Sequence, residues 1–241
     1  MADLLIDVGN TLTKVAIWEG EKARQLFKLP TLSFLSHPEL LTEKLKSFVW
    51  KRVGISSVVR EATDALRKIF PDATFVSADL DLPIKIDYKT PETLGADRIA
   101  NACGGLEFGE SFAVVSAGTA VVVDLVRDSV FQGGVIFPGL KTMAKALNLE
   151  TSQLPEIEIL QRFQIPGKST TECIESGILV ALIGGIKETL KTYNINTILL
   201  TGGDSKILRK FLREIILVPD LTLKGIRKVL ESNPPLLRGD N

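Results

Sequence analysis

The chain has 241 residues, of which 45% are apolar and 24% charged, a composition typical of globular proteins with a buried core. Lys and Arg together number 29, as do Asp and Glu, so the formal net charge is zero. This balance excludes a global basic field for nucleic acid or an anionic membrane, and we expect neither as a partner. A local phosphate site stays open, because backbone N–H groups bind phosphate without net positive charge.

Cysteine and histidine are scarce. Cys103 and Cys173 form no CxxC pair, so neither a disulfide framework nor a structural zinc site is expected. His37 is the only histidine, and its loop-like context before Pro38 favours a structural role. A general base, if the chain has one, is therefore expected to be a carboxylate or a lysine.

The chain starts without the basic region and the apolar run of a signal peptide. It also has no uncharged apolar run of 18 residues. We therefore expect a cytoplasmic protein.

Alternating and buried patterns predict a three-stranded meander at the start of the chain, followed by mixed α/β structure. The predicted strands cover residues 3–8, 12–18, 22–29, 51–58 and 73–77, and the predicted helices cover 38–49 and 60–70.

The second half follows a connection rich in Pro and Asp over residues 82–92. Its predicted strands cover 112–117, 120–127, 130–136 and 197–200, and its predicted helices cover 95–106, 139–149, 170–192, 205–214 and 223–231. This half also contains a three-stranded meander.

The two halves align. The segment 5–10 lies over 114–119 at an offset of 109 residues, and in each an apolar strand meets a glycine at the same place. A repeat of this size predicts two duplicated domains, 1–108 and 109–241, with a cleft between them. Strand–glycine–strand units are also common by chance, which is the alternative.

The first hairpin carries Asp7, Gly9, Asn10 and Thr11. A carboxylate at a strand end can hold Mg²⁺ beside the phosphates of a nucleotide, and a glycine lets backbone approach them. The alternative is a plain hairpin with an Asx turn.

Two glycine turns in the second half suit phosphate as well. Gly118 and Thr119 follow the aligned strand, and Gly202 and Gly203 follow the strand over 197–200. The alternatives are a tight hairpin and an ordinary strand–helix turn capped by the side chain of Asp204.

Gly95-Ala96-Asp97-Arg98 stands at a predicted helix start. Asp97 could act as a general base and Arg98 could bind an anion, although an Asp in a first turn is already favoured by the helix dipole. Ser169 and Glu172 form a predicted capping box, which by itself explains the residues before the long helix.

In order and spacing, these motifs together resemble type III pantothenate kinase over nearly the whole chain. The resemblance rests on Asp7-Val-Gly-Asn-Thr, Tyr88, Gly95-Ala-Asp-Arg98, Gly118-Thr-Ala, Gly133-Gly-Val-Ile-Phe-Pro-Gly139 and Thr201-Gly-Gly-Asp204. It implies an α/β fold of two duplicated ribonuclease-H-like, actin-like ATPase domains with a nucleotide cleft. It implies ATP-dependent phosphorylation of pantothenate to 4'-phosphopantothenate, the first committed step to coenzyme A, by a homodimer.

The resemblance also implies roles for residues of this chain. Asp97 would take the proton of the pantothenate hydroxyl, and Asp7 would lie near Mg²⁺. The expected nucleotide-binding residues are Asp7, Val8, Gly9, Asn10, Thr11, Leu12, Thr13, Lys14, Gly118, Thr119, Gly202 and Gly203. The expected pantothenate-binding residues are Tyr88, Gly95, Ala96, Asp97, Arg98 and Thr170, with Thr170 supplied by the partner subunit.

Two positions depart from the family pattern. Ser116 stands where the family has an Asp that binds a monovalent cation, usually K⁺, and Val122 stands where it has Thr, although Asp124 is kept. Either the enzyme needs no K⁺ or NH₄⁺, or it is a weak or altered kinase.

Two other function classes stay open from the sequence. One is a non-catalytic regulator on the same fold, as the name Bvg accessory factor in this family suggests, and the other is a different actin-like phosphotransferase or hydrolase. Asp7, Asp97 and Arg98 favour catalysis over the regulator, and the motif over residues 95–98 favours pantothenate over another acceptor.

Overall fold

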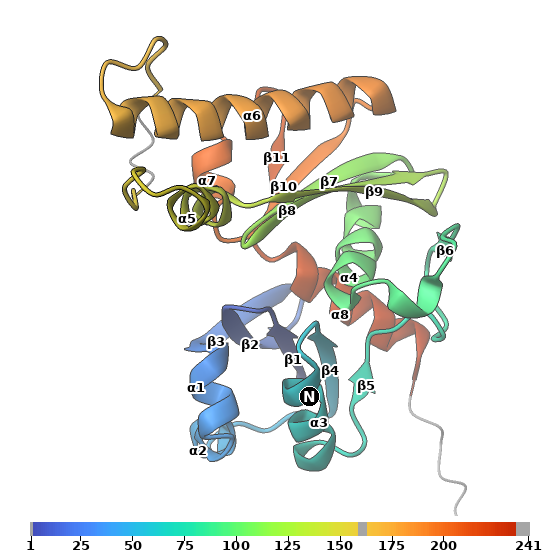
Figure 1. Cartoon of the computed structure of the whole chain (residues 1–241). Helices are drawn as coiled ribbons and strands as arrows, with labels where there is room; N and C mark the ends of the chain where they lie inside the picture. Colours follow the sequence, from blue (N-terminus) through green and yellow to red (C-terminus); the bar gives the residue numbers. More distant parts are fainter. Residues whose placement is uncertain (1, 159–162, 235–241) are drawn as a thin grey trace, which may run out of the picture. The chain divides into compact units, whose positions relative to one another are not determined.

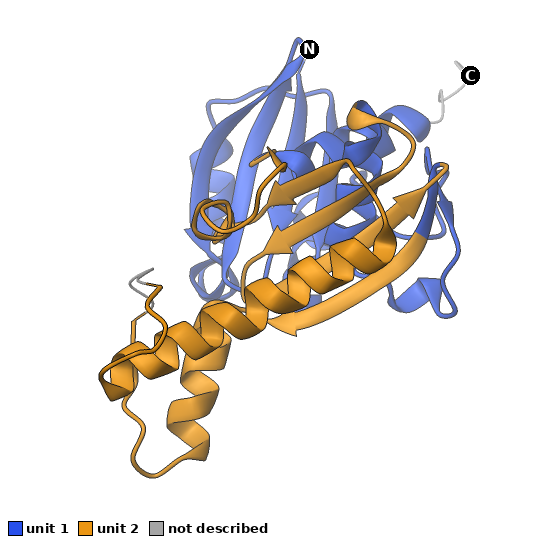
Figure 2. Cartoon of the chain, turned by 90° about the horizontal axis from the view of Figure 1, so that it is seen from above, with its two compact units in different colours: residues 1–107, 129–131, 220–241 blue, residues 108–128, 132–219 orange. Residues whose placement is uncertain are grey.

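The computed structural model describes residues 2–158 and 163–234. The chain divides into two compact units (Figure 2), each considered by itself. Unit 1 comprises residues 1–107, 129–131 and 220–241, and unit 2 comprises 108–128 and 132–219. The C-terminal segment from residue 220 is grouped with unit 1, whereas the expected second domain was 109–241.

Unit 1 is built on a five-stranded sheet in the order β3-β2-β1-β4-β5 (Figure 1). The strands are β1 (Asp3–Val8), β2 (Leu12–Glu19), β3 (Lys22–Pro30), β4 (Arg52–Ser57) and β5 (Thr74–Phe75). Its helices are α1 (Thr31–Ser36), α2 (Glu39–Leu45), α3 (Arg60–Ile69), α4 (Ala96–Gly105) and α8 (Leu221–Ser232). Two 3₁₀ turns flank α4, at Pro91–Thr93 and Leu106–Phe108.

Strand alternation decides which face of the sheet each side chain of β1 lies on. Leu4, Ile6 and Val8 belong to one hydrophobic cluster together with residues of α1, α2 and α3. Because successive side chains of a strand point to opposite faces, Asp3 and Asp7 face the other side of the sheet. That side is the one that α8 contacts, since its Ile226 and Leu230 lie against Gly54 of β4.

Helices α4 and α8 cross at very close range, and glycines permit it. A Cβ added to Gly225 would lie 1.6 Å from the carbonyl oxygen of Ala100, and one added to Gly104 would lie 2.5 Å from that of Leu221. Any larger residue would push the helices apart. The crossing therefore fixes the position of α4, which carries Asp97 near its start.

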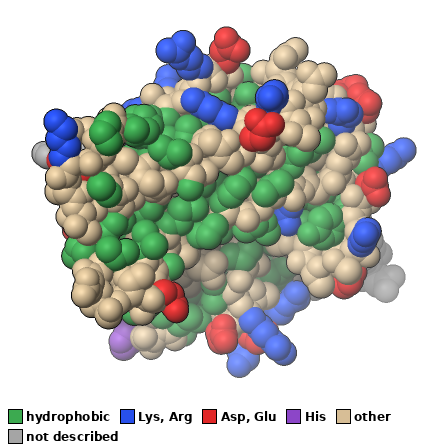
Figure 3. All heavy atoms as spheres, turned by 45° about the horizontal axis from the view of Figure 1, so that its top comes forward, with side chains coloured by type: hydrophobic (Ala, Val, Ile, Leu, Met, Phe, Trp, Pro, Cys, Tyr) green, Lys and Arg blue, Asp and Glu red, His purple; other side chains and the backbone are tan. Residues whose placement is uncertain are grey.

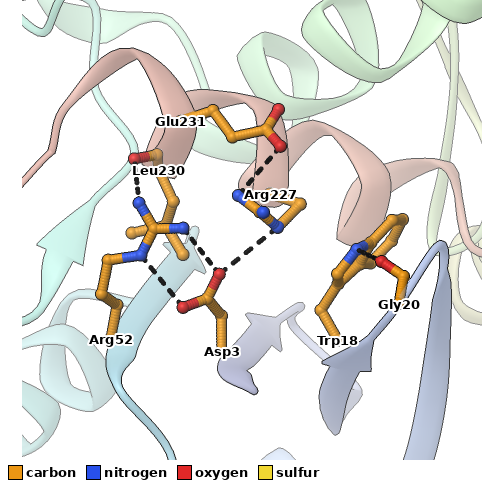
Figure 4. A network of polar contacts seen from close by, with 7 residues as sticks. All are labelled: Asp3, Trp18, Gly20, Arg52, Arg227, Leu230 and Glu231. Atoms are coloured by element: carbon orange, nitrogen blue, oxygen red, sulfur yellow. Dashed lines mark hydrogen bonds and ion pairs between the residues drawn. The ribbon is translucent and has the colours of Figure 1, made fainter. Parts of the chain in front are cut away.

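A buried ion-pair network ties β1 to β4 and α8 (Figure 4). The Arg52 guanidinium donates to both Asp3 oxygens at 3.0 and 2.7 Å and to the carbonyl of Leu230 at 2.8 Å. Arg227 lies 3.3 Å from Asp3 and 3.1 Å from Glu231. The network lies at the end of β1 opposite to Asp7.

Unit 2 contains most of a six-stranded sheet in the order β11-β10-β7-β8-β9-β6. The strands are β6 (Lys85–Ile86), β7 (Phe112–Ala117), β8 (Ala120–Arg127), β9 (Val130–Pro138), β10 (Ile198–Thr201) and β11 (Ile216–Leu217). β6 pairs with the first two residues of β9, and both β6 and these two residues belong to unit 1. Helices α5 (Leu140–Glu150), α6 (Thr170–Tyr193) and α7 (Ser205–Leu208) pack on β7, β8 and β10 through one hydrophobic cluster.

The predicted repeat is confirmed by the strand order. From the meander outward, the strand orders are β3-β2-β1-β4-β5 and β9-β8-β7-β10-β11. The pairs β1–β2 and β7–β8 are antiparallel, and the pairs β1–β4 and β7–β10 are parallel. Asp7 pairs with Ser56 of β4, and Ser116 pairs with Thr201 of β10. The aligned residues therefore occupy equivalent places in the two sheets.

Local predictions were wrong at two helices. The helix expected over 38–49 is shorter, since α2 covers only Glu39–Leu45, and the helix α1 that precedes the turn at His37-Pro38 was not expected. The helix expected over 205–214 ends at Leu208. After it, the N–H groups of Lys210 and Phe211 donate to the carbonyls three residues before them, in the pattern of a 3₁₀ turn. The short strands β6 and β11 were not expected. Over residues 2–158 and 163–234, no helix has the length and apolarity to cross a membrane.

Candidate active site

Asp7 is the carboxylate at the end of β1. Its residue surface is 6% exposed, and Lys14, its register partner on β2, donates to Oδ2 from Nζ at 2.9 Å. The hairpin turn is fixed by backbone, since Gly9 N–H donates to the carbonyl of Leu12 at 3.0 Å. Thr31 secures it further by donating to the carbonyl of Gly9 at 2.7 Å. Asp7 is thus a largely desolvated charge with one cationic partner.

Asp97 lies in the first turn of α4, after Gly95 at the N-cap. Its Oδ1 accepts a hydrogen bond of 2.8 Å from the N–H of Arg98. Burial raises the pKa of the Asp97 carboxyl and the negative charge of Asp7 raises it further, while Arg98 lowers it in part. A Cβ added to Gly95 would lie 2.8 Å from that same Oδ1, so a larger residue there would displace the carboxylate.

Arg98 is a buried cation that lies beside two aromatic rings. Its guanidinium carbon lies 5.6 Å from the ring centre of Tyr88 and 5.4 Å from that of Phe131, and the two rings lie edge to face at 6.0 Å. Such contacts stabilise a guanidinium with restricted access to water. The sequence indicated Tyr88 and Arg98 but missed Phe131, because its proximity depends on the pairing of β6 with β9.

A pocket of about 660 Å³ adjoins the same motif in unit 1. Its walls come from the segment after β4, the start of α3, residues 76–79 and residues 91–96. Gly95 and Ala96 line it, but the side chains of Asp97 and Arg98 do not. The pocket therefore meets the backbone of the motif rather than its charged groups.

In unit 2, the hairpin after β7 is packed against the start of α5. The carbonyl of Thr119 accepts from the N–H of Gly139 at 2.9 Å and from the hydroxyl of Thr142 at 2.7 Å. A Cβ on Gly139 would lie 2.0 Å from the carbonyl oxygen of Gly118. The hairpin is therefore held rigidly, with Thr119 on the surface.

The turn after β10 reaches the same hairpin. Gly202 has a φ of +95°, and a Cβ there would lie 2.2 Å from the carbonyl oxygen of Ala117. The N–H of Asp204 donates to that carbonyl at 3.0 Å. Asp204 stands at the N-cap of α7, but its side chain makes no capping hydrogen bond, so the interpretation of it as a side-chain cap was wrong.

Ser116 and Thr170 also belong to unit 2. Ser116 is half-buried on β7 beside Thr201. Thr170 is exposed as the first residue of α6, behind Ser169, whose hydroxyl accepts from the N–H of Glu172 at 3.3 Å. The predicted N-cap at Ser169 is confirmed, although the Glu172 carboxylate bonds the N–H of Lys168 instead of closing the box.

The structure thus brings the expected residues together in two groups. Asp7, Lys14, Tyr88 and residues 95–98 belong to unit 1, whereas Gly118, Thr119, Gly202 and Gly203 cluster in unit 2. His37 lies apart in an exposed pair with Glu39, consistent with a structural role.

Solved structures define the class of the fold. A conserved Baf-family protein from Campylobacter jejuni matches with a TM-score of 0.68 and 23% identity, over 97% of this chain and 100% of that one. A ROK-family glucokinase from Streptomyces griseus, solved with glucose and AMPPNP, matches with a TM-score of 0.54 and 11% identity, over 94% and 98%. The fold is the two-domain α/β fold of actin-like ATPases and sugar kinases, as expected from the sequence.

Sequence comparisons then define the family. The model described as type III pantothenate kinase matches residues 3–192. A type III pantothenate kinase from Aquifex aeolicus is 36% identical over 236 residues, 95% of this chain and 97% of that protein. One from Thermosipho africanus is 33% identical over 239 residues, 92% and 96%. The chain belongs to the type III pantothenate kinase family.

Membership confirms the expected activity. The chain is a kinase that phosphorylates pantothenate with ATP, in the biosynthesis of coenzyme A. The alternatives of a non-catalytic regulator and of another phosphotransferase are set aside by this finding.

Proposed function

We propose that Asp97 is the general base of this kinase. The observation that carries the proposal is its environment: a half-buried carboxylate, close enough to the charge of Asp7 for its pKa to be raised, at the start of a helix fixed by a glycine crossing. A carboxylate with a raised pKa is a better proton acceptor at neutral pH. The hydroxyl of pantothenate gives its proton to Asp97 while its oxygen bonds to the γ-phosphorus of ATP and the bond to ADP breaks.

The same proposal places ATP on the glycine turns. Residues 7–14 would contact it through the fixed backbone of Gly9 and the side chain of Lys14. Gly118, Thr119, Gly202 and Gly203 are the corresponding residues of unit 2. Turns without side chains at the closest points leave backbone N–H groups accessible to phosphate oxygens.

A magnesium ion fits Asp7. Among the described residues no three His, Cys, Asp or Glu side chains gather, so no cage made only of protein ligands is offered. Mg²⁺ commonly takes one or two carboxylates with waters and substrate phosphates, which a single desolvated carboxylate satisfies. The bound ion would neutralise charge on the transferring phosphoryl group. Lys14 holds Asp7 oriented.

A monovalent cation does not fit Ser116. Its hydroxyl is neutral, and the register partner Thr201 is another hydroxyl, so the pair offers no charge to a cation. We infer that this kinase works without K⁺ or NH₄⁺ at that position.

For the acceptor site we propose Tyr88, Gly95, Ala96 and Arg98, with Thr170. Arg98 is buried, with its guanidinium beside two rings, and this low exposure to water strengthens its attraction for an anionic group of the substrate. The carboxylate of pantothenate is such a group.

We also propose a homodimer, formed through unit 2. Large apolar side chains are exposed there, including Ile136 at 61%, Val180 at 46% and Leu149 at 68%. Hydrophobic side chains gather on the side on which α6 lies (Figure 3). Exposed apolar patches mark association surfaces. Sedimentation should show a dimer that Val180→Glu weakens, whereas Leu32→Glu at an exposed site of unit 1 should leave the dimer intact. A wild-type monomer at micromolar concentration would exclude the dimer.

A cytoplasmic location stays a prediction.

The base is tested with Asp97→Asn. We expect kcat to fall by about 10² to 10⁴, the usual contribution of a general base. Unfolding temperature should not fall, because burial disfavours the charged form that the substitution removes. Glu92→Gln, an exposed carboxylate in the preceding turn, serves as control and should keep full activity. Near-normal turnover by Asp97→Asn would exclude Asp97 as the base.

The nucleotide site is tested with Gly203→Val. A Cβ at Gly203 meets no protein atom within 4 Å, so the fold accepts a side chain there. If phosphate or ribose approaches this backbone, the valine should raise KM for ATP without lowering the unfolding temperature. An unchanged KM would remove Gly203 from the nucleotide site.

A further inference from the structure

Asp204 is a carboxylate without a visible partner in unit 2. It is half-buried, and burial raises the pKa of its carboxyl, which the charge of Lys141 lowers in part. Among residues 2–158 and 163–234 its side chain forms no hydrogen bond and no ion pair within 4 Å, and it does not cap α7. The carboxylate has lost part of its water without gaining a protein donor, so a ligand that supplies a donor would stabilise it.

The position of Asp204 in the fold indicates which ligand group would lie beside it. Asp204 directly follows Gly202 and Gly203, and its N–H is bonded to the carbonyl of Ala117, just before the Gly118–Thr119 hairpin. The carboxylate is thus anchored beside the turns assigned above to the nucleotide, and the inference rests on that assignment. Lys141, in the first turn of α5, is the cation within electrostatic reach.

The chemistry of ATP narrows the choice of group. Its phosphates are anionic acceptors that a carboxylate repels, and they suit Lys141 instead. Its donors are the two ribose hydroxyls and the amino group of adenine. A carboxylate offers two adjacent acceptor oxygens, which match a vicinal diol, and in dinucleotide-binding folds an Asp or Glu accepts from ribose in this manner.

We propose that Asp204 accepts hydrogen bonds from the ribose hydroxyls of ATP and makes this kinase select ribonucleotides over 2'-deoxyribonucleotides. The bond joins a hydroxyl to a charged acceptor, so its loss is worth about tenfold or more in kcat/KM.

The test compares kcat/KM for ATP and 2'-dATP. The wild type should prefer ATP by about tenfold or more, and Asp204→Ala should reduce the preference to near unity. Asp204→Asn, which keeps one acceptor oxygen, should fall between. Asp220→Ala is the matched control, because Asp220 is the N-cap of α8 with nearly the same backbone angles and also makes no side-chain cap. A ratio is insensitive to general damage to the fold.

Two results would overturn the proposal. One is a wild type that uses both nucleotides equally, or a preference that survives in Asp204→Ala. The other is an Asp204→Ala variant in which the ratio of kcat/KM for ATP to that for ITP changes while the preference for ATP over 2'-dATP stays intact. That result would show that the carboxylate contacts the adenine ring. If Gly203→Val raises KM for ATP while Asp204→Ala leaves the ribose preference intact, only the role of Asp204 fails. If both variants behave as the wild type, the nucleotide assignment itself fails.

Discussion

Asp3→Asn tests how much the ion-pair network around Asp3, the first residue of β1, contributes to stability. The substitution keeps the shape of the side chain and removes the charge that two guanidinium groups share, at 2.7 Å for Arg52 and 3.3 Å for Arg227. Breaking a buried pair from one side costs about 3–5 kcal/mol, because the remaining charge loses its partner. The side chain of Asp3 is 7% exposed but those of the arginines keep 19% and 20%, so we expect the lower end, about 3 kcal/mol.

The assay follows from the placement of the tryptophans. Trp18 and Trp50 are the only two in the chain, and both lie in unit 1, so their fluorescence reports the unfolding of that unit. A loss of about 3 kcal/mol should lower its midpoint by roughly 6–12 °C. Glu19→Gln breaks a similar two-bond pair with Arg24, whose side chains are both 52% exposed, and should change the midpoint little. Equal shifts in the two variants would refute the view that burial makes the Asp3 network matter.

Three further outcomes follow from the site. Gly225→Ala should destabilise unit 1 by about 3 kcal/mol and lower kcat, because its Cβ would collide with the Ala100 carbonyl of α4 and push α4 away from α8. Thermal unfolding and turnover measure the two effects, and a neutral result would contradict the close crossing. Because the pKa of Asp97 is raised, kcat/KM should fall with decreasing pH at values above the ordinary carboxyl range, as the base is protonated; a profile flat down to pH 4 would contradict this. Activity should change little when K⁺ or NH₄⁺ is added, since Ser116 carries no charge; strong activation would show that another group binds the cation.

The sequence predicted those parts of the fold that local pattern determines. Strands β1 and β7 have the expected bounds, because each is an apolar run ended by a glycine turn, and α6 begins where the Ser169 cap predicted. The membership of α8 in unit 1 was not predicted, since it depends on Gly225 meeting α4 at long range. The sequence indicated Tyr88 and Arg98 as site residues but did not predict their contact, and Phe131 comes near Arg98 through a strand pairing that no local pattern reveals.

The repeat explains why the two hairpins cannot be equivalent in function. Both place a residue at the same register point of the same strand order, yet Asp7 faces a lysine across its hairpin and Ser116 faces Val122. A carboxylate paired with a cation can exchange that partner for a metal or a phosphate-bound ion, whereas a serine opposite a valine offers only a neutral hydroxyl, which donates and accepts hydrogen bonds without carrying charge. In unit 2, the nearest acidic residue across the hairpin is the buried Asp124, two residues from Val122, and a further carboxylate, Asp204, lies within the electrostatic influence of Lys141. The duplicated frame therefore fixes where ligand groups can lie, and the charged residues that differ between the copies decide which groups each half can bind.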